Sequence, residues 1–63
     1  MGNNNSSITH YLIAIDTQIF EISFFQMRVV AAPRAIKFLI GRSSTQVKMW
    51  VDNRGGTFKK INR

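Results

Sequence analysis

The chain has no cysteine, one histidine and only three acidic residues among its 63 residues. The absence of cysteine excludes disulfides and thiolate metal sites. A closed metal site needs about four ligands, and His10, Asp16, Glu21 and Asp52 are the only other side chains of the usual metal-binding types. We therefore expect neither a metal ion nor another cofactor.

A chain of 63 residues has room for one small domain. Such a domain buries only about 60% of the surface that its unfolded chain exposes, so its core is marginal. Small domains are usually stabilised by disulfides, a metal or a partner, and this sequence offers neither of the first two. Because 44% of the residues are apolar, we expect a protein partner, a homo-oligomer or nucleic acid to cover part of the surface.

The few acidic residues lie mostly in the first half of the chain. Residues 1–27 contain Asp16 and Glu21 and no Lys or Arg, which gives a net charge of −2. Residues 28–63 contain all nine Lys and Arg residues and one acid, a net charge of +8, so the whole chain carries +6. A strong positive field attracts nucleic acid or anionic lipid, and we therefore expect a polyanionic partner.

No apolar run is long enough to cross a membrane, because a spanning helix takes about 20 mostly apolar residues. The longest such region, residues 8–32, is interrupted by Asp16, Glu21 and Arg28. The N-terminus also lacks the basic segment that begins a secretory signal. Together with the absence of cysteine, these features predict an intracellular protein.

Residues 1–7 are polar, and we expect them to be a disordered leader before a single domain over residues 8–63. Gly2 and Ser6 also match the pattern for N-myristoylation. A chance match in a flexible leader is the simpler interpretation. An acyl chain on Gly2, combined with the basic half, would make a membrane-surface adaptor, so membrane binding is expected only if Gly2 is acylated.

Residues 8–30 are rich in β-branched and aromatic side chains, which favour strands. Phe20, Ile22 and Phe24 alternate with their neighbours, and Asp16-Thr17-Gln18 provides a turn. We predict two strands, over residues 9–15 and 19–27. A single helix stays open as the alternative, because several isoleucines of this segment also fit a helical period.

Residues 31–41 change in character. Pro33 stands where a helix would begin and Gly41 where it would end. Ile36 and Leu39 belong to an apolar stripe between them, so we predict one short helix over residues 33–40. A strand is the alternative, since Ile36 and Phe38 also alternate with their neighbours.

Residues 46–63 predict a basic C-terminal β-hairpin. Val47, Met49 and Val51 alternate with their neighbours, and residues 52–56 contain the Asn and Gly that tight turns need. Residues 57–61 would form the returning strand. The predicted fold class is therefore α+β, a small single domain with antiparallel β-strands, one short helix and this hairpin.

The sequence offers little for catalysis. General acid–base catalysis needs paired titratable groups, and the only candidates are His10 with Asp16 or Glu21. The chain has no nucleophile elbow and no glycine-rich phosphate loop. We predict a protein that is not an enzyme and has no small-molecule substrate, with His10 as an ordinary surface residue.

Basic side chains project from the predicted hairpin, with Trp50 among them. Cations on phosphates and aromatic rings on unpaired bases are the usual means of binding RNA, and a two-stranded ribbon also fits the major groove of DNA. We predict non-catalytic nucleic-acid binding, RNA slightly ahead of DNA, within a larger complex or oligomer. A buried Trp50 and a solvated row of lysines are the simpler alternative. The expected phosphate contacts are Lys48, Arg54, Lys59, Lys60 and Arg63, with Arg42 and Trp50 as weaker candidates.

Aromatic side chains also crowd the second predicted strand. A patch of Phe20, Phe24 and Phe25 on the surface would mark an interface, and the chain would then be a small protein-binding module or inhibitor. Simple burial of these three rings in the core is the alternative.

Overall fold

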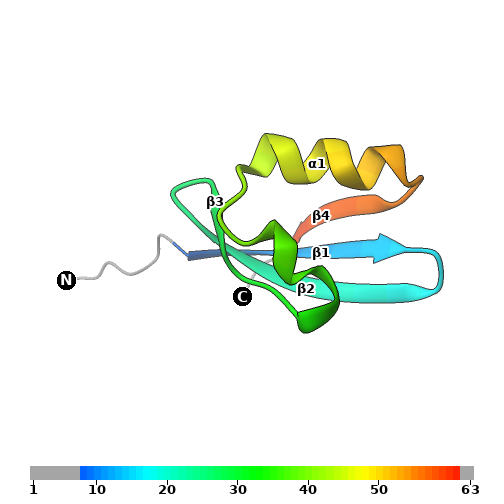
Figure 1. Ribbon diagram of the computed structural model, residues 1–63, viewed down its shortest axis with the longest axis horizontal. Coiled ribbons are helices and arrows are strands. Elements are labelled where there is room, and N and C mark those ends of the chain that lie inside the picture. Colours follow the sequence, from blue (N-terminus) through cyan, green and yellow to red (C-terminus); the bar gives the residue numbers. More distant parts are fainter. Residues whose placement is uncertain (1–7, 62–63) are drawn as a thin grey trace.

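The computed structural model describes residues 8–61 (Figure 1). Its elements in chain order are β1 (Ile8–Ile15), β2 (Gln18–Phe25), β3 (Arg28–Ala31), the 3₁₀ helix η2 (Arg34–Leu39), α1 (Ser44–Asn53) and β4 (Thr57–Ile61). The strands form one antiparallel sheet in the order β3-β2-β1-β4. The predicted α+β class is therefore confirmed. The predictions for the polar leader, Gly2 and Arg63 fall outside the described residues and stay predictions.

β1 and β2 form a hairpin, so the two strands predicted here are confirmed and the helical alternative is wrong. Their pairing runs from Ile8 opposite Phe25 to Ile15 opposite Gln18. Asp16 begins the turn with a φ of 56°, a left-handed conformation that Asp adopts more readily than most residues. β-branched and aromatic side chains fit the pleated surface, and this preference decides between strand and helix.

β3 is a short edge strand that the sequence pattern does not reveal. The second predicted strand runs to residue 27, whereas β2 ends at Phe25 and the chain reverses through Gln26 and Met27. Both turn residues have positive φ, 52° and 67°, where Asn and Gly are expected. The sequence does not predict this turn, because Gln and Met are not typical turn residues.

The short helix predicted over residues 33–40 is confirmed as η2, and the strand alternative is wrong. Pro33 precedes the helix and Gly41 follows it with a φ of 90°, as the proline-first, glycine-last preference requires. Ile36 and Leu39 are its buried side chains. The apolar stripe therefore packs inward as predicted.

The first arm of the predicted C-terminal hairpin is wrong, because residues 44–53 form α1. The Ser43 hydroxyl accepts a hydrogen bond from the Gln46 backbone N–H, which is the action of a helix N-cap. Val47 and Val51 are fully buried, whereas Met49 between them is 60% exposed. Burial at an interval of four is helical, although the same valines also fit a period of two.

The second arm of the predicted hairpin exists as β4, but it pairs with β1 rather than with the segment before it. Ile13 of β1 lies opposite Phe58 of β4. Gly55 turns the chain after α1 with a φ of 69°. Gly56 passes the Ala14 carbonyl oxygen so closely that a Cβ atom would clash with it. The two glycines therefore serve a helix-to-strand connection and not a hairpin turn.

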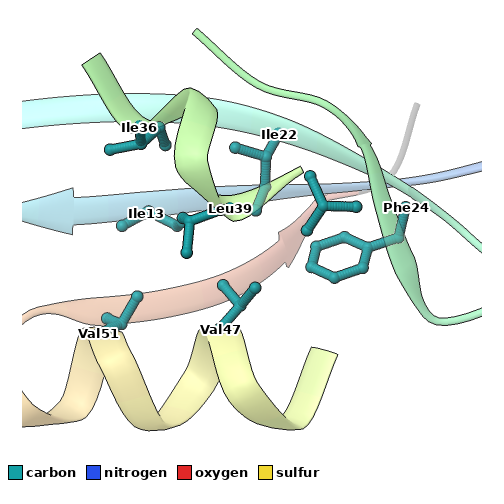
Figure 2. Packing of buried hydrophobic residues seen from close by; sticks show 8 residues of the cluster. Ile13, Ile22, Phe24, Ile36, Leu39, Val47 and Val51 are labelled. Atoms are coloured by element: carbon teal, nitrogen blue, oxygen red, sulfur yellow. The ribbon is translucent and has the colours of Figure 1, made fainter. Parts of the chain in front are cut away.

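The core lies between one face of the sheet and the two helices (Figure 2). Figure 2 shows Leu39 of η2 and the two valines of α1 pointing toward Ile13. The buried side chains are Ile13, Ile22, Phe24, Val29, Ile36, Leu39, Val47 and Val51. The buried residues of the strands all lie on this one face, and no element among residues 8–61 covers the opposite face of the sheet.

Candidate nucleic-acid interface

A groove between η2 and α1 is lined by two aromatic rings. Phe38 of η2 and Trp50 of α1 meet edge to face, with ring centroids 5.4 Å apart and planes at 72°. Leu39, Arg42 and Gln46 complete the walls of a cavity of about 220 Å³. Sites for drug-sized ligands have about 300–1,000 Å³, so this groove has room for a single flat ring system, such as one base of a longer strand.

Each aromatic ring projects beside a buried residue. Trp50 precedes Val51 in α1, and part of its side chain packs against the core while the rest lines the groove. Phe38 precedes Leu39 in η2, and its side chain is 57% exposed. The burial of Leu39 and Val51 therefore fixes the spacing between the two rings.

Two arginines accompany the rings. The guanidinium carbon of Arg54 lies 4.9 Å from the centroid of the Trp50 ring, within the range of a cation–π interaction, and Arg42 forms part of the wall. Neither arginine forms a salt bridge with a carboxylate among residues 8–61. The groove thus combines aromatic surface with positive charge that no neighbouring acid of the described chain neutralises.

The structure therefore brings together three of the predicted nucleic-acid-binding residues, Arg42, Trp50 and Arg54. Trp50 is neither a wholly buried core residue nor a fully exposed one, since it takes part in both the core and the groove. Arg42 and Trp50, the weaker candidates in the sequence, line the groove, and of the stronger candidates Arg54 lies beside it.

The other predicted cations lie elsewhere. Lys48 occupies another side of α1, with its ammonium nitrogen 3.2 Å from a carboxylate oxygen of Asp52. Lys59 and Lys60 are consecutive in β4, so they point to opposite faces of the sheet. The predicted row of cations along a C-terminal hairpin is therefore wrong, because that hairpin does not form.

Phe38 and Gln46 belong to the groove but were not among the predicted binding residues. Gln46, Trp50 and Arg54 follow one another at intervals of four, and such residues lie along one side of a helix. That spacing, together with Ser43 as an N-cap, was the signal for both the helix and this side of the groove. No comparable signal exists for Phe38, because its position depends on how η2 packs against α1.

The predicted aromatic interface is not one surface. Phe24 is only 2% exposed and belongs to the core, and Phe20 is partly buried against that core. Phe25 is 40% exposed and, as the next residue of β2 after Phe24, points to the opposite face of the sheet. Only Phe25 of the three is therefore placed for contact with a partner, and core burial is the correct interpretation of Phe24.

His10 lies beside Glu21, as an acid–base pair would require. Its Nδ1 is 3.4 Å from Oε2 of Glu21 and 3.2 Å from Oγ of Ser23. In a catalytic triad the nucleophile and the orienting carboxylate contact opposite nitrogens of the imidazole. Here both contact the same nitrogen, so the three residues do not form a triad.

Comparison with known proteins gives no family assignment, because no family model, curated protein or solved structure matches the chain. Within residues 8–61, no group of three or more His, Asp or Glu side chains is placed to hold a metal ion. In the same part of the chain, no helix is long and apolar enough to cross a membrane. Any functional proposal therefore depends on the geometry and charge of the groove.

Proposed function

We propose that the protein is a non-catalytic domain that binds single-stranded nucleic acid, RNA ahead of DNA, in the groove between η2 and α1. The observation that carries this proposal is the Arg54 guanidinium over the Trp50 ring, beside an exposed Phe38. Proteins hold single strands by stacking bases on aromatic rings and placing cations along the backbone. A duplex offers no unstacked base to such a groove.

Phe38 supplies the stacking surface. Its side chain is 57% exposed, and a base stacked on an aromatic ring contributes about 1–3 kcal/mol to binding. Trp50 contacts this ring edge to face and so limits its rotation. Because the ring is held in place before binding, little side-chain entropy is lost when a base stacks on it.

Arg42 and Arg54 supply the phosphate contacts. A guanidinium group binds phosphate through its N–H groups and stacks through its flat face. The guanidinium group of Arg54 already lies over the Trp50 ring, and its N–H groups would then contact a phosphate. The +8 charge of residues 28–63 attracts the strand from a distance, and the groove then positions it.

The salt dependence of binding follows from the number of phosphates contacted. Each phosphate on a single strand changes the slope of log K against log salt by about −0.7. Two to four contacts at and near the groove therefore predict a slope of about −1.5 to −3. A steeper slope would mean that cations far from the groove contribute most of the affinity.

Fluorescence anisotropy of labelled oligonucleotides tests the proposal. We expect oligouridine of about ten nucleotides to bind more tightly than the same length of duplex DNA, with oligothymidine between them. Phe38→Ala should weaken oligouridine binding by about 5- to 160-fold, which corresponds to the loss of one stacked base. Arg42→Ala/Arg54→Ala should weaken it and flatten the salt slope by about 1.4, for two lost phosphate contacts.

Lys48→Ala is the matched control, because it removes a positive charge from α1 on a side away from the groove. It should bind oligouridine nearly as well as the wild-type protein. Folding of each variant is checked by circular dichroism. Wild-type affinity in folded Phe38→Ala and in folded Arg42→Ala/Arg54→Ala would place any binding outside the groove and overturn the proposal.

A further inference from the structure

The sheet face opposite the helices carries an apolar stripe. We call it the open face, and it consists of the even-numbered residues of β1 and the odd-numbered residues of β2 and β4. Ile19 is 70% exposed there, Ile8 42% and Phe25 40%. His10 and Ser23 lie between the Ile8–Phe25 end of this face and Leu12. Exposed apolar side chains gathered on one face mark a surface that meets a partner.

A carboxylate and an ammonium group lie in one row of the open face. Leu12 of β1 is paired with Glu21 of β2 on one side and with Lys59 of β4 on the other. Directly opposed residues of neighbouring strands lie on the same face. Across the sheet, this row therefore consists of Glu21, then Leu12 at its centre, then Lys59.

We infer that two copies of the chain pack through their open faces, sheet against sheet, about a two-fold axis parallel to β1. This axis exchanges the β2 side of one copy with the β4 side of the other. Glu21 then faces the partner's Lys59, Lys59 faces the partner's Glu21, and Leu12 packs on the partner's Leu12. The face is complementary to itself in both charge and apolar character, which is what a symmetric dimer needs.

The charges oppose two other simple arrangements. A two-fold axis across the strands would lay β4 on the partner's β4 and bring Lys59 toward the partner's Lys59. Pairing of β4 edge to edge would extend the sheet and would also bring the lysines of the two copies together. Lysines on an edge strand oppose such pairing. Only the axis along β1 sets opposite charges face to face.

The size of the open face predicts a weak dimer. Strands lie about 4.8 Å apart and rise about 3.3 Å per residue, so three strands of up to eight residues cover on the order of 400 Å² per copy. The total of about 800 Å² is below the roughly 1,600 Å² of a standard interface. We therefore expect micromolar dissociation constants and a dimer that depends on protein concentration.

Sedimentation equilibrium of charge-swapped variants tests the arrangement. Glu21→Lys and Lys59→Glu each place like charges face to face, and each should weaken dimerisation by about tenfold or more. The double variant Glu21→Lys/Lys59→Glu restores opposite charges and should regain wild-type affinity within about threefold. Recovery of this kind is the result expected when the two residues meet across the dimer interface.

Two further variants separate the open face from the rest of the surface. Ile19→Asp, at a side chain that is 70% exposed, should leave the circular dichroism spectrum unchanged and abolish the dimer. Met49→Asp, at a side chain on α1 that is 60% exposed, should leave the dimer intact. Ile19→Asp should also keep its affinity for oligouridine, because the groove lies on the other side of the sheet.

Two results would overturn the inference. One is a wild-type protein that stays monomeric up to millimolar concentration, and the other is a double charge swap that dimerises as poorly as the single variants. If Lys59→Glu or Ile19→Asp instead abolishes oligouridine binding without changing the mass in solution, the open face binds nucleic acid rather than a second copy. That outcome is distinct from failure of the groove, which Phe38→Ala reports.

Discussion

Neighbouring residues of β1 have opposite surroundings. Ile13 points to the helices and has no exposed surface, whereas Leu12 and Ala14 on either side of it point to the open face and are only half-buried. Both faces of the sheet carry apolar side chains, but the elements within residues 8–61 cover only one of them. A small domain packs one layer of helices on its sheet, and within residues 8–61 that layer lies on one face only.

The two helices that cover one face of the sheet also form the candidate binding groove between them. The helices that bury Leu39 and Val51 hold Phe38 and Trp50 side by side on their outer surface. The position of the two helices therefore determines both how they pack on the sheet and how the groove is formed. No helix among residues 8–61 lies over the open face, where strand pairing sets the rows of side chains.

The largest difference between the faces should appear in the free energy of unfolding. Ile13→Ala removes a fully buried side chain and should cost about 2–5 kcal/mol, because a cavity is added to the lost burial. Leu12→Ala on the half-buried side should cost clearly less, roughly 1 kcal/mol. Urea denaturation measures both. Equal losses would show that the open face is packed as tightly as the core.

Ile13→Ala can fail to fold in a domain of marginal stability. Ile13→Val then serves in its place, with an expected loss of about 0.5–1.5 kcal/mol.

The helix layer itself should be sensitive to its N-cap. Ser43→Ala removes the hydroxyl that accepts the Gln46 N–H and should lower the free energy of unfolding by about 1 kcal/mol. Thr45→Ala, at an exposed position in the first turn of α1, is the control and should have little effect. A neutral Ser43→Ala would mean that packing alone determines where α1 begins.

The turn between β2 and β3 should gain stability when its backbone strain is relieved. Met27 has a φ of 67° and its side chain is 68% exposed. Met27→Gly should therefore raise the free energy of unfolding by up to about 1 kcal/mol, because glycine adopts positive φ without strain. Val30→Gly in β3 should lower it instead. A loss of stability in Met27→Gly would show that the Met27 side chain contributes more than its strain costs.

The smallest effect is expected at the exposed ion pair of α1. Lys48→Ala removes the contact with Asp52, where both side chains are more than half exposed, and should cost less than about 0.5 kcal/mol. The loss should shrink further at about 1 M salt, where screening is strong. A larger loss would give Lys48 a structural role that its geometry does not indicate.

The two halves of the chain differ in how well their sequence predicts them. Residues 8–25 show a clear period of two and form the predicted strands. Val47, Met49 and Val51 show the same period, but Val47 and Val51 are also four apart, and the Ser43 cap turns this segment into a helix. β3 escaped prediction because Gln26 and Met27 form a tight turn without turn-forming residue types.

The candidate site was predictable in part. The residue types of Arg42, Trp50 and Arg54 marked them as possible contacts for a polyanion. Arg42 and Trp50 meet in one groove with Phe38 because η2 packs against α1, and no short-range pattern encodes that contact. The faces on which Lys59 and Lys60 lie follow from the pairing of β4 with β1 and not from a hairpin, and their phosphate contacts stay a prediction.

The fluorescence of Trp50 tests the central claim most directly, because it is the only tryptophan of the chain and lines the groove. Titration with oligouridine at about 50 mM salt should change this fluorescence to a saturating level, and added salt should reverse the change. The same response is expected from Lys48→Ala, and a much weaker one from Phe38→Ala. Oligouridine that binds by anisotropy yet leaves Trp50 fluorescence unchanged, or that does not bind at all, would contradict the account.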